Sequence, residues 1–100
     1  MKAYTETDND ILTVRVEGEI NTITTPELAK RVEDLGGVKQ LVFDLGGVRY
    51  VSSAGLRLFL ACQRTMTASR GEMRIQNCDE LVAEIFKGVG YDRIMKIETK

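Results

Sequence analysis

Alternation of apolar and polar residues predicts strands at both ends of the chain. The clearest run is Ile11–Glu17, and Glu72–Asn77 alternates in the same way, whereas Ala3–Thr7 and Ile94–Ile97 are more weakly indicated as short strands. This period is typical of a strand that buries one face. The turn-forming cluster Asp8–Asp10 separates the first two segments, so we expect them to form a hairpin.

A helix is predicted between the loop Gly18–Thr25 and the glycine pair Gly36-Gly37. Thr25 is expected to be its N-cap, because a threonine hydroxyl can accept a hydrogen bond from a free backbone N–H, and Pro26 suits the first helical turn. Glycine is common just after the last turn of a helix. The side expected to face the core consists of Leu28, Ala29, Val32 and Leu35.

The middle of the chain, Leu41 to Leu60, contains the strongest apolar signal. Leu41–Leu45 is typical of a strand buried on both faces, and Gly46-Gly47 predicts a sharp turn that ends it. The pair Ser52-Ser53 then precedes an apolar run that we expect to form a buried helix as far as about Ser69. The predicted order is therefore strand, tight loop, serine pair and helix.

A further helix is predicted near the end of the chain, with Asp79 as its N-cap and Gly88 at its end. Its apolar stripe is expected to consist of Leu81, Val82, Ile85 and Phe86. Strands that alternate with helices after an opening hairpin favour an α/β fold, with a mixed sheet of four to five strands and about three helices packed on it. We expect one domain that spans residues 1–100.

Charge and composition exclude several classes of function. The 100 residues carry a formal net charge of −1 with both signs interspersed, so there is no basic footprint for nucleic acid. No apolar run approaches the ~20 residues that a membrane span needs, and residues 1–6 contain no signal-peptide core. We therefore expect a cytosolic protein that binds neither nucleic acid nor membrane.

The chain also offers little for cofactor or metal chemistry. Cys62 and Cys78 lie on apolar segments without CxxC spacing, and we expect both to be buried free thiols. Gly46-Gly47 lacks the pattern of a nucleotide phosphate loop. Asp44, at the end of a buried strand, is expected to accept hydrogen bonds from backbone N–H groups between Gly46 and Val48, because an unpaired buried carboxylate is costly.

Three roles are open to Ser52 and Ser53. One of them can cap the predicted helix, one can be a nucleophile, or one can be a phosphorylation site held at the helix N-terminus. The chain contains no histidine, so the usual base of a serine nucleophile is missing. Spacing alone does not choose between the cap and the phosphorylation site.

The segment Phe43–Leu56 resembles the signature of the STAS domain, the fold of bacterial anti-sigma factor antagonists. In that family a strand carrying Asp-Leu leads to a phosphorylatable serine followed by a small residue, glycine and leucine. Placed on this sequence, the serine is Ser53. The resemblance extends to Gly18–Asn21, Pro26 and Leu28, and it covers nearly the whole chain.

The resemblance implies a regulatory binding protein and not an enzyme. Its unphosphorylated form would bind an anti-sigma factor that is a serine kinase and would release a sigma factor. Phosphorylation of Ser53 by that kinase would stop binding, and a metal-dependent serine phosphatase would reverse it. The implied docking surface comprises the loop Gly46–Ser53, the start of the following helix and the loop Asn21–Thr25. The implied partner-binding residues are Asn21, Thr22, Thr24, Gly46, Gly47, Ser52, Ser53, Ala54, Gly55 and Arg57.

Two departures from the family pattern affect this prediction. Ser52 stands where an aspartate often precedes the phosphorylated serine, and Asn21 replaces an acid often found after the second strand. We expect their absence to slow phosphorylation or to change the choice of partner. The same fold also suits a STAS subunit of a lipid-transport ATPase complex, and we expect a monomer or a weak dimer. The missing histidines and nucleotide loop count against an enzymatic or ligand-binding α/β domain.

Overall fold

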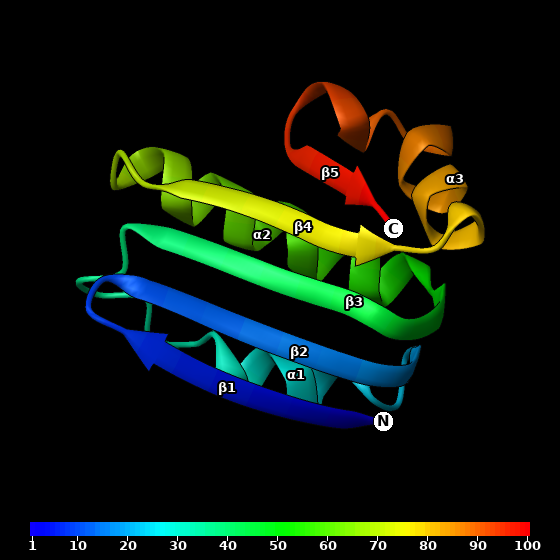
Figure 1. The fold of residues 1–100 in the computed structure, drawn as a ribbon, viewed down its shortest axis with the longest axis horizontal. Coiled ribbons are helices and arrows are strands. Elements are labelled where there is room, and N and C mark those ends of the chain that lie inside the picture. Colours follow the sequence, from blue (N-terminus) through cyan, green and yellow to red (C-terminus); the bar gives the residue numbers. More distant parts are fainter.

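In a computed structural model that describes residues 1–100, five strands form one sheet in the order β1-β2-β3-β4-β5 (Figure 1). β1 pairs with β2 in an antiparallel hairpin, and the remaining neighbours are parallel. This confirms the predicted hairpin and the mixed sheet. The strands are β1 (Lys2–Asp8), β2 (Ile11–Ile20), β3 (Gln40–Val51), β4 (Glu72–Cys78) and β5 (Lys96–Thr99).

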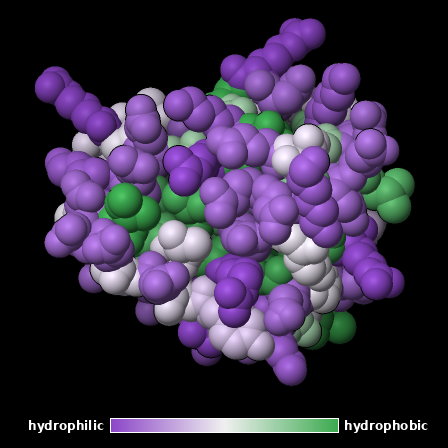
Figure 2. All heavy atoms as spheres, in the orientation of Figure 1, coloured by the Kyte–Doolittle hydropathy of each residue, from purple (hydrophilic) through white to green (hydrophobic).

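Three α-helices and one short 3₁₀ helix, η1, connect the strands, as the alternation predicts. Figure 1 shows α1 and α2 behind the sheet, so that its front face stays open, and α3 beside the end of β4. The open face is largely hydrophilic (Figure 2). No helix combines the length and apolar character needed to cross a membrane. The helices are α1 (Thr25–Arg31), α2 (Ser53–Ala68), α3 (Glu80–Gly88) and η1 (Tyr91–Arg93).

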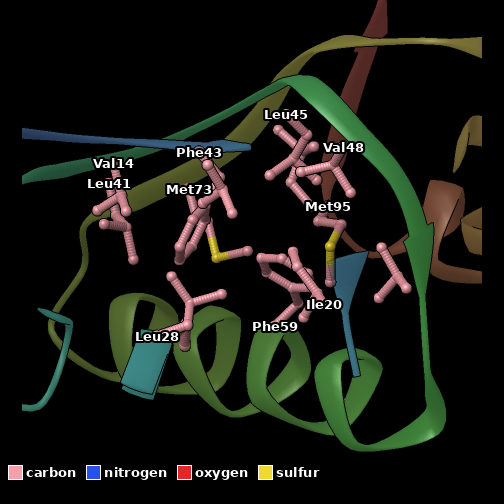
Figure 3. Packing of buried hydrophobic residues seen from close by; sticks show 14 of the residues in the cluster. Val14, Ile20, Leu28, Leu41, Phe43, Leu45, Val48, Phe59, Met73 and Met95 are labelled. Carbon is pink, nitrogen blue, oxygen red and sulfur yellow. The ribbon is translucent and has the colours of Figure 1, made fainter. Parts of the chain in front are cut away.

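The core lies between the sheet and the helices and contains three phenylalanines, of which Figure 3 shows Phe43 and Phe59. The ring of Phe59 on α2 meets Phe43 of β3 edge to face, with centroids 4.8 Å apart, and meets Phe86 of α3 at 5.5 Å. Edge-to-face contacts are a favoured geometry for aromatic pairs. All three side chains are fully buried, which confirms that Phe86 faces the core as predicted.

β3 is longer than predicted, because Gly46-Gly47 does not end it. Leu41, Val42 and Phe43 are buried as expected, but the strand continues through both glycines to Val51. The predicted sharp turn is therefore wrong. A Cβ on Gly47 would lie 2.8 Å from Cγ of Glu17 on β2, so this glycine permits close strand pairing instead of a turn.

β2 is also longer than expected, so the loop that was predicted to begin at Gly18 begins later in the chain. The strand continues through Gly18, whose φ is +98°, to Ile20, and the loop begins only at Asn21. The backbone N–H and C=O groups of residues 18–20 find partners in the extended β3, and this long-range pairing cannot be seen in the local sequence.

α1 differs from its prediction at both ends. Thr24, not Thr25, is the N-cap residue, and its hydroxyl makes no capping bond. The helix ends at Arg31, because Val32 leaves the helical region with φ −127° and turns its side chain into the core. The carboxylate of Asp34 then accepts a hydrogen bond from the N–H of Gly36 at 3.0 Å, a local turn that competes with further helix.

α3 has the predicted cap but not the whole predicted stripe. Asp79 Oδ1 accepts a hydrogen bond from the N–H of Val82 at 2.9 Å, which fixes the start of the helix. Val82 and Phe86 are then fully buried, whereas Leu81 is 71% exposed. The core-facing side of α3 is centred on Val82 and Phe86, which are four residues apart, and Leu81 lies outside it. The assignment of Leu81 to the core is wrong.

Candidate functional site

Two irregularities in β3 direct the chain toward the serine pair. The register with β2 shifts by one residue after Asp44 and again after Val48, so β3 carries two bulges. Leu45, Val48 and Val51 consequently point into the core at every third position, and the two residues between each pair face outward. Figure 3 shows β3 bending past Leu45 and Val48 toward the start of α2.

Ser52 and Ser53 lie next to each other but in different environments. Ser52 is the N-cap of α2, and its Oγ accepts a long hydrogen bond of 3.4 Å from the N–H of Gly55. Its own N–H donates to the carbonyl of Ile20 at 2.8 Å, which ties it to the end of β2. Ser53 is the first residue of α2 and is exposed, and its hydroxyl makes no hydrogen bond within the chain. The capping role left open by the sequence therefore belongs to Ser52.

Gly55 sets how closely α2 approaches the sheet. A Cβ at this position would lie 2.6 Å from Cγ2 of Ile20 and 2.9 Å from Cγ1 of Val51. Only glycine lets the first turn of α2 pack against the ends of β2 and β3 at this distance. Gly55 is buried, and its close packing positions Ser53 at the start of α2. Its predicted contact with a partner stays a prediction.

The loop after β2 is held by its own side chains. Asn21 Oδ1 accepts hydrogen bonds from the N–H groups of Ile23 and Thr24 at 2.9 and 3.0 Å. Thr24 Oγ1 accepts from the N–H of Asn21 and donates to the carbonyl of Glu19, both at 2.9 Å. Both hydrogen bonds that Asn21 Oδ1 accepts come from within the loop, so the Asn21 side chain stabilises the conformation of this loop. Ile23 is left 86% exposed.

The loop after β2 and the serine pair begin next to each other at one edge of the sheet. Ile20 and Val51 are paired neighbours at the ends of the parallel strands β2 and β3, and Asn21 and Ser52 follow them directly. β4 pairs with β3 only as far as Asp44 and ends at Cys78, so α3 begins several residues short of the ends of β2 and β3. We call the region that follows β2 and β3 the serine edge. It comprises Asn21–Thr24 and Ser52–Arg57, and it brings together the predicted residues Asn21, Thr22, Thr24, Ser52, Ser53, Ala54 and Arg57.

Gly46 and Gly47 do not belong to the serine edge. They lie six or seven residues before Ser53, on the side of β3 that faces away from the core. A Cβ on Gly46 would collide with the side chain of Asn77 on β4, which gives this glycine a packing role. Both are structural glycines of the strand.

Asp44 has the structural role expected of it. Its Oδ1 accepts a hydrogen bond from the N–H of Gly46 at 3.0 Å and a second from Asn77 Nδ2 at 3.3 Å. The expected bond to backbone near Gly46 is therefore confirmed. No group of three or more histidine, cysteine, aspartate or glutamate residues is placed to hold a metal ion.

Both cysteines are buried free thiols, as predicted. Burial raises the pKa of Cys62 to about 11. Burial, and then the nearby carboxylates of Asp79 and Asp44, raise the pKa of Cys78 to about 12. Neither sulfur is an accessible thiolate near neutral pH.

Two apolar residues were not predicted to be exposed. Ile23 lies between threonines in a loop read as polar, and Leu81 was assigned to the core stripe of α3. An isolated isoleucine in a Thr-rich loop is the one signal in the sequence that could have indicated a surface contact.

Comparisons with known proteins agree with this architecture. The model of the family described as "STAS domain" matches residues 2–100. The "Anti-sigma-B factor antagonist" of Staphylococcus aureus is 25% identical over 95 residues, which cover 93% of this chain and 88% of the relative.

Solved structures share the fold at low sequence identity. An anti-sigma factor antagonist from Mycobacterium paratuberculosis superposes with a TM-score of 0.87 at 21% identity, covering 99% of this chain and 86% of the other. The anti-sigma factor antagonist SpoIIAA in its unphosphorylated form gives 0.85 at 17% identity, covering 99% and 90%. The phosphorylated form of SpoIIAA, from Bacillus, gives 0.77 at 17% identity, covering 99% and 93%.

Proposed function

The chain belongs to the STAS domain family, and from this premise we propose that it is a cytosolic anti-sigma factor antagonist switched by phosphorylation of Ser53. The unphosphorylated form binds an anti-sigma factor that is an ATP-dependent serine kinase, and a sigma factor is released. The kinase phosphorylates Ser53 and ends binding, and a serine phosphatase restores it. The names of the relatives support this class of function, and the two solved forms of SpoIIAA support a phosphorylation switch.

The observation that carries the proposal is the different state of the two serines. Ser53 is exposed with a free hydroxyl, whereas Ser52 is engaged as the helix cap. Ser53 is a substrate in this proposal and not a nucleophile, since the chain has no histidine to activate it.

The fold has room for a phosphate at this position. A phosphoserine carries about −1.5 to −2 charge at neutral pH, and negative charge is favoured at a helix N-terminus. The first turn of α2 contains no acidic residue, and Arg57 lies four positions after Ser53, on the same side of the helix. The modification is therefore expected to leave the protein folded.

The phosphate is expected to weaken the complex with the kinase. A partner surface shaped for a neutral hydroxyl would have to desolvate a dianion, at a cost of about 2–5 kcal/mol when a charge is buried unpaired at an interface. Since ~1.4 kcal/mol changes an affinity tenfold, this is enough to separate a tight complex from a weak one.

The test uses each serine kinase of the anti-sigma factor type encoded in the same genome. Wild type, Ser53→Ala and Ser52→Ala are incubated with the kinase and ATP, and the phosphate is located by mass spectrometry. We expect phosphate on Ser53 in wild type and in Ser52→Ala, and none in Ser53→Ala, which should still bind the kinase. Phosphate on Ser52 alone, or no phosphate with any kinase, would refute the assignment.

A further inference from the structure

β1 is a long edge strand with no neighbour on its outer side. It lies first in the strand order of the sheet, and all seven of its residues pair with β2 without a register shift. Figure 1 shows no other segment along its outer side. Proteins commonly protect such an edge with a proline, a bulge or a covering helix, and β1 has none of these. The strand at the other edge, β5, has only four residues.

The outward backbone groups of β1 have no partner in the chain. Apart from the ladder with β2, no backbone hydrogen bond involves Lys2–Asp8. In an antiparallel ladder alternate residues bond to the neighbouring strand, and the residues between them direct N–H and C=O away from it. Asp8 and Ile11 flank the two-residue turn of the hairpin, so they form a hydrogen-bonded pair. The outward residues are therefore Ala3, Thr5 and Thr7.

The charges along β1 complement those of a second copy that runs antiparallel to it. The outward residues of one copy have to pair with those of the other, and one register pairs all seven residues, with Thr5 opposite Thr5 of the second copy. This register sets Lys2 opposite Asp8 of the second copy, and the two-fold axis repeats the pair. Opposite charges directly across a ladder are favourable.

Other arrangements of the two strands bring like charges together or leave residues unpaired. A parallel pair in register sets Lys2, Glu6 and Asp8 each beside its own copy, and like charges directly opposite are destabilising. A shift of the antiparallel register by two residues in one direction sets Glu6 opposite Glu6, and the same shift in the other direction leaves Asp8 without a partner. Charge therefore selects one two-fold arrangement, which closes as a dimer.

A second polar contact favours the same register. Tyr4 is opposite Glu6 of the second copy in this register, on the open face of the sheet. The guanidinium of Arg15 lies over the ring of Tyr4, 4.8 Å from its centroid, and so brings a positive charge toward that glutamate. The ring of Tyr4 is 43% exposed in the single chain. Pairing of the two strands covers part of this surface.

We propose that the outer side of β1 is a self-association surface through which two copies form a weak antiparallel dimer, with one sheet that continues through both. Only one pair of strands meets, so we expect a dissociation constant of about 10 μM to 1 mM, typical of a small interface. The contact uses the side of the sheet and not the ends of β2 and β3, so it does not involve Ser53. The dimer therefore needs neither a kinase nor phosphorylation.

Thr5→Cys tests the position of the two-fold axis. In the proposed register the two introduced thiols face each other with Cα atoms about 5.5 Å apart, which a disulfide can span. The matched control is Thr7→Cys on the same strand, whose two copies lie about 14 Å apart, too far for a disulfide. Under mild oxidation Thr5→Cys should form a covalent dimer at least about tenfold faster than Thr7→Cys. The native thiols Cys62 and Cys78 are buried and should react slowly.

Reversal of one charge tests the ion pairs. Sedimentation equilibrium at low salt, with up to about 1 mM protein, should detect the wild-type dimer. Asp8→Lys sets a lysine opposite Lys2 of the second copy and should weaken dimerisation at least about fivefold. Glu98→Lys is the matched control, because it makes the same change of charge at an exposed residue of the other edge strand. It should stay within about twofold of wild type.

Three outcomes overturn the inference. The first is a wild type that stays monomeric up to about 1 mM. The second is equal cross-linking of Thr5→Cys and Thr7→Cys, which would place the dimer contact on another surface. The third is an equal loss in Asp8→Lys and Glu98→Lys, which would show that net charge decides association. None of these results changes the proposed function, because Ser53 lies outside the contact.

Discussion

The hydroxyl of Tyr91 donates a hydrogen bond to the carbonyl oxygen of Leu56 at a distance of 3.0 Å. Leu56 lies in the opening turns of α2, close behind Ser53, and Tyr91 begins η1 near the end of the chain. The ring of Tyr91 also packs 6.3 Å from that of Phe86 on α3. The last segment of the chain therefore braces the helix that presents the serine.

Removing this hydroxyl should destabilise the fold slightly. Tyr91→Phe keeps the ring contact and loses one hydrogen bond, so the free energy of unfolding in urea should fall by about 0.5–1.5 kcal/mol. The matched control is Tyr50→Phe, since Tyr50 is exposed and its hydroxyl makes no hydrogen bond within the chain. Equal unfolding curves for the two variants would show that the bond to Leu56 contributes nothing to stability.

The close approach at Gly55 gives a second prediction. In Gly55→Ala the added methyl group would lie 2.6 Å from Ile20 Cγ2, so α2 has to move away from the sheet. We expect a loss of about 1–3 kcal/mol, the usual cost of overpacking, measured by urea unfolding. Because α2 carries Ser53, the rate of phosphorylation should fall as well.

Gly88→Ala is the control for this substitution. Gly88 also lies in a helix, but a Cβ there meets no atom within 4 Å. Alanine restricts the unfolded chain more than glycine does, so the control should be neutral or stabilising by about 0.4–1 kcal/mol. Equal effects at both positions would mean that helix propensity, and not the contact with Ile20, decides the result.

The sequence predicted the elements well where the signal was local. The strand Leu41–Phe43 followed from its apolar run, and α3 followed from its cap at Asp79. A capping side chain and the backbone N–H that it binds are close in sequence, so such signals can be read without the fold.

The sequence failed where distant segments decide the structure. Gly46-Gly47 was interpreted as a turn because paired glycines usually mark one. In the fold Gly47 pairs with Glu17 of β2 and Gly46 packs against Asn77 of β4, and both partners are distant in the sequence. The exposure of Leu81 was missed for a related reason, because it depends on which side of α3 the core occupies.

The buried thiols predict how stability changes with pH. The pKa values of about 11 for Cys62 and about 12 for Cys78 lie above the value of 9.0 for a free thiol. The folded state thus holds these protons more tightly than the unfolded state. Their contribution to stability is complete below pH 9 and is lost as the pH rises through the folded-state values. The free energy of unfolding should therefore fall more steeply between pH 9 and 11 in wild type than in the variant with both cysteines replaced by alanine.

The same burial should slow thiol chemistry near neutral pH. A thiol reagent should label both cysteines slowly in the native protein and quickly after unfolding in urea, because the thiolate is the reactive form. Fast labelling of either native cysteine, or identical pH dependence in wild type and the alanine variant, would contradict the raised pKa values.

Replacing Ser53 by aspartate should separate stability from binding. A carboxylate in the first turn of α2 meets free backbone N–H groups and lies one turn before Arg57, so the thermal midpoint should stay the same or rise, by about 0.3–1 kcal/mol in free energy. Binding to the kinase should weaken, because the carboxylate has to be desolvated in the complex. The effect should be smaller than that of phosphate, whose charge is larger.

Ser52→Ala should show the opposite pattern to Ser53→Asp, with lower stability and unchanged binding. It removes the hydroxyl that accepts from the N–H of Gly55, so stability should fall by about 0.5–2 kcal/mol while Ser53 stays neutral and able to bind. Calorimetry and binding measured on the same samples would then give one variant that is stable and binds weakly and another that is less stable and binds well. If Ser53→Asp instead lost its fold, a negative charge at this position would act through stability and not through binding. That result would contradict the proposed switch at an exposed hydroxyl.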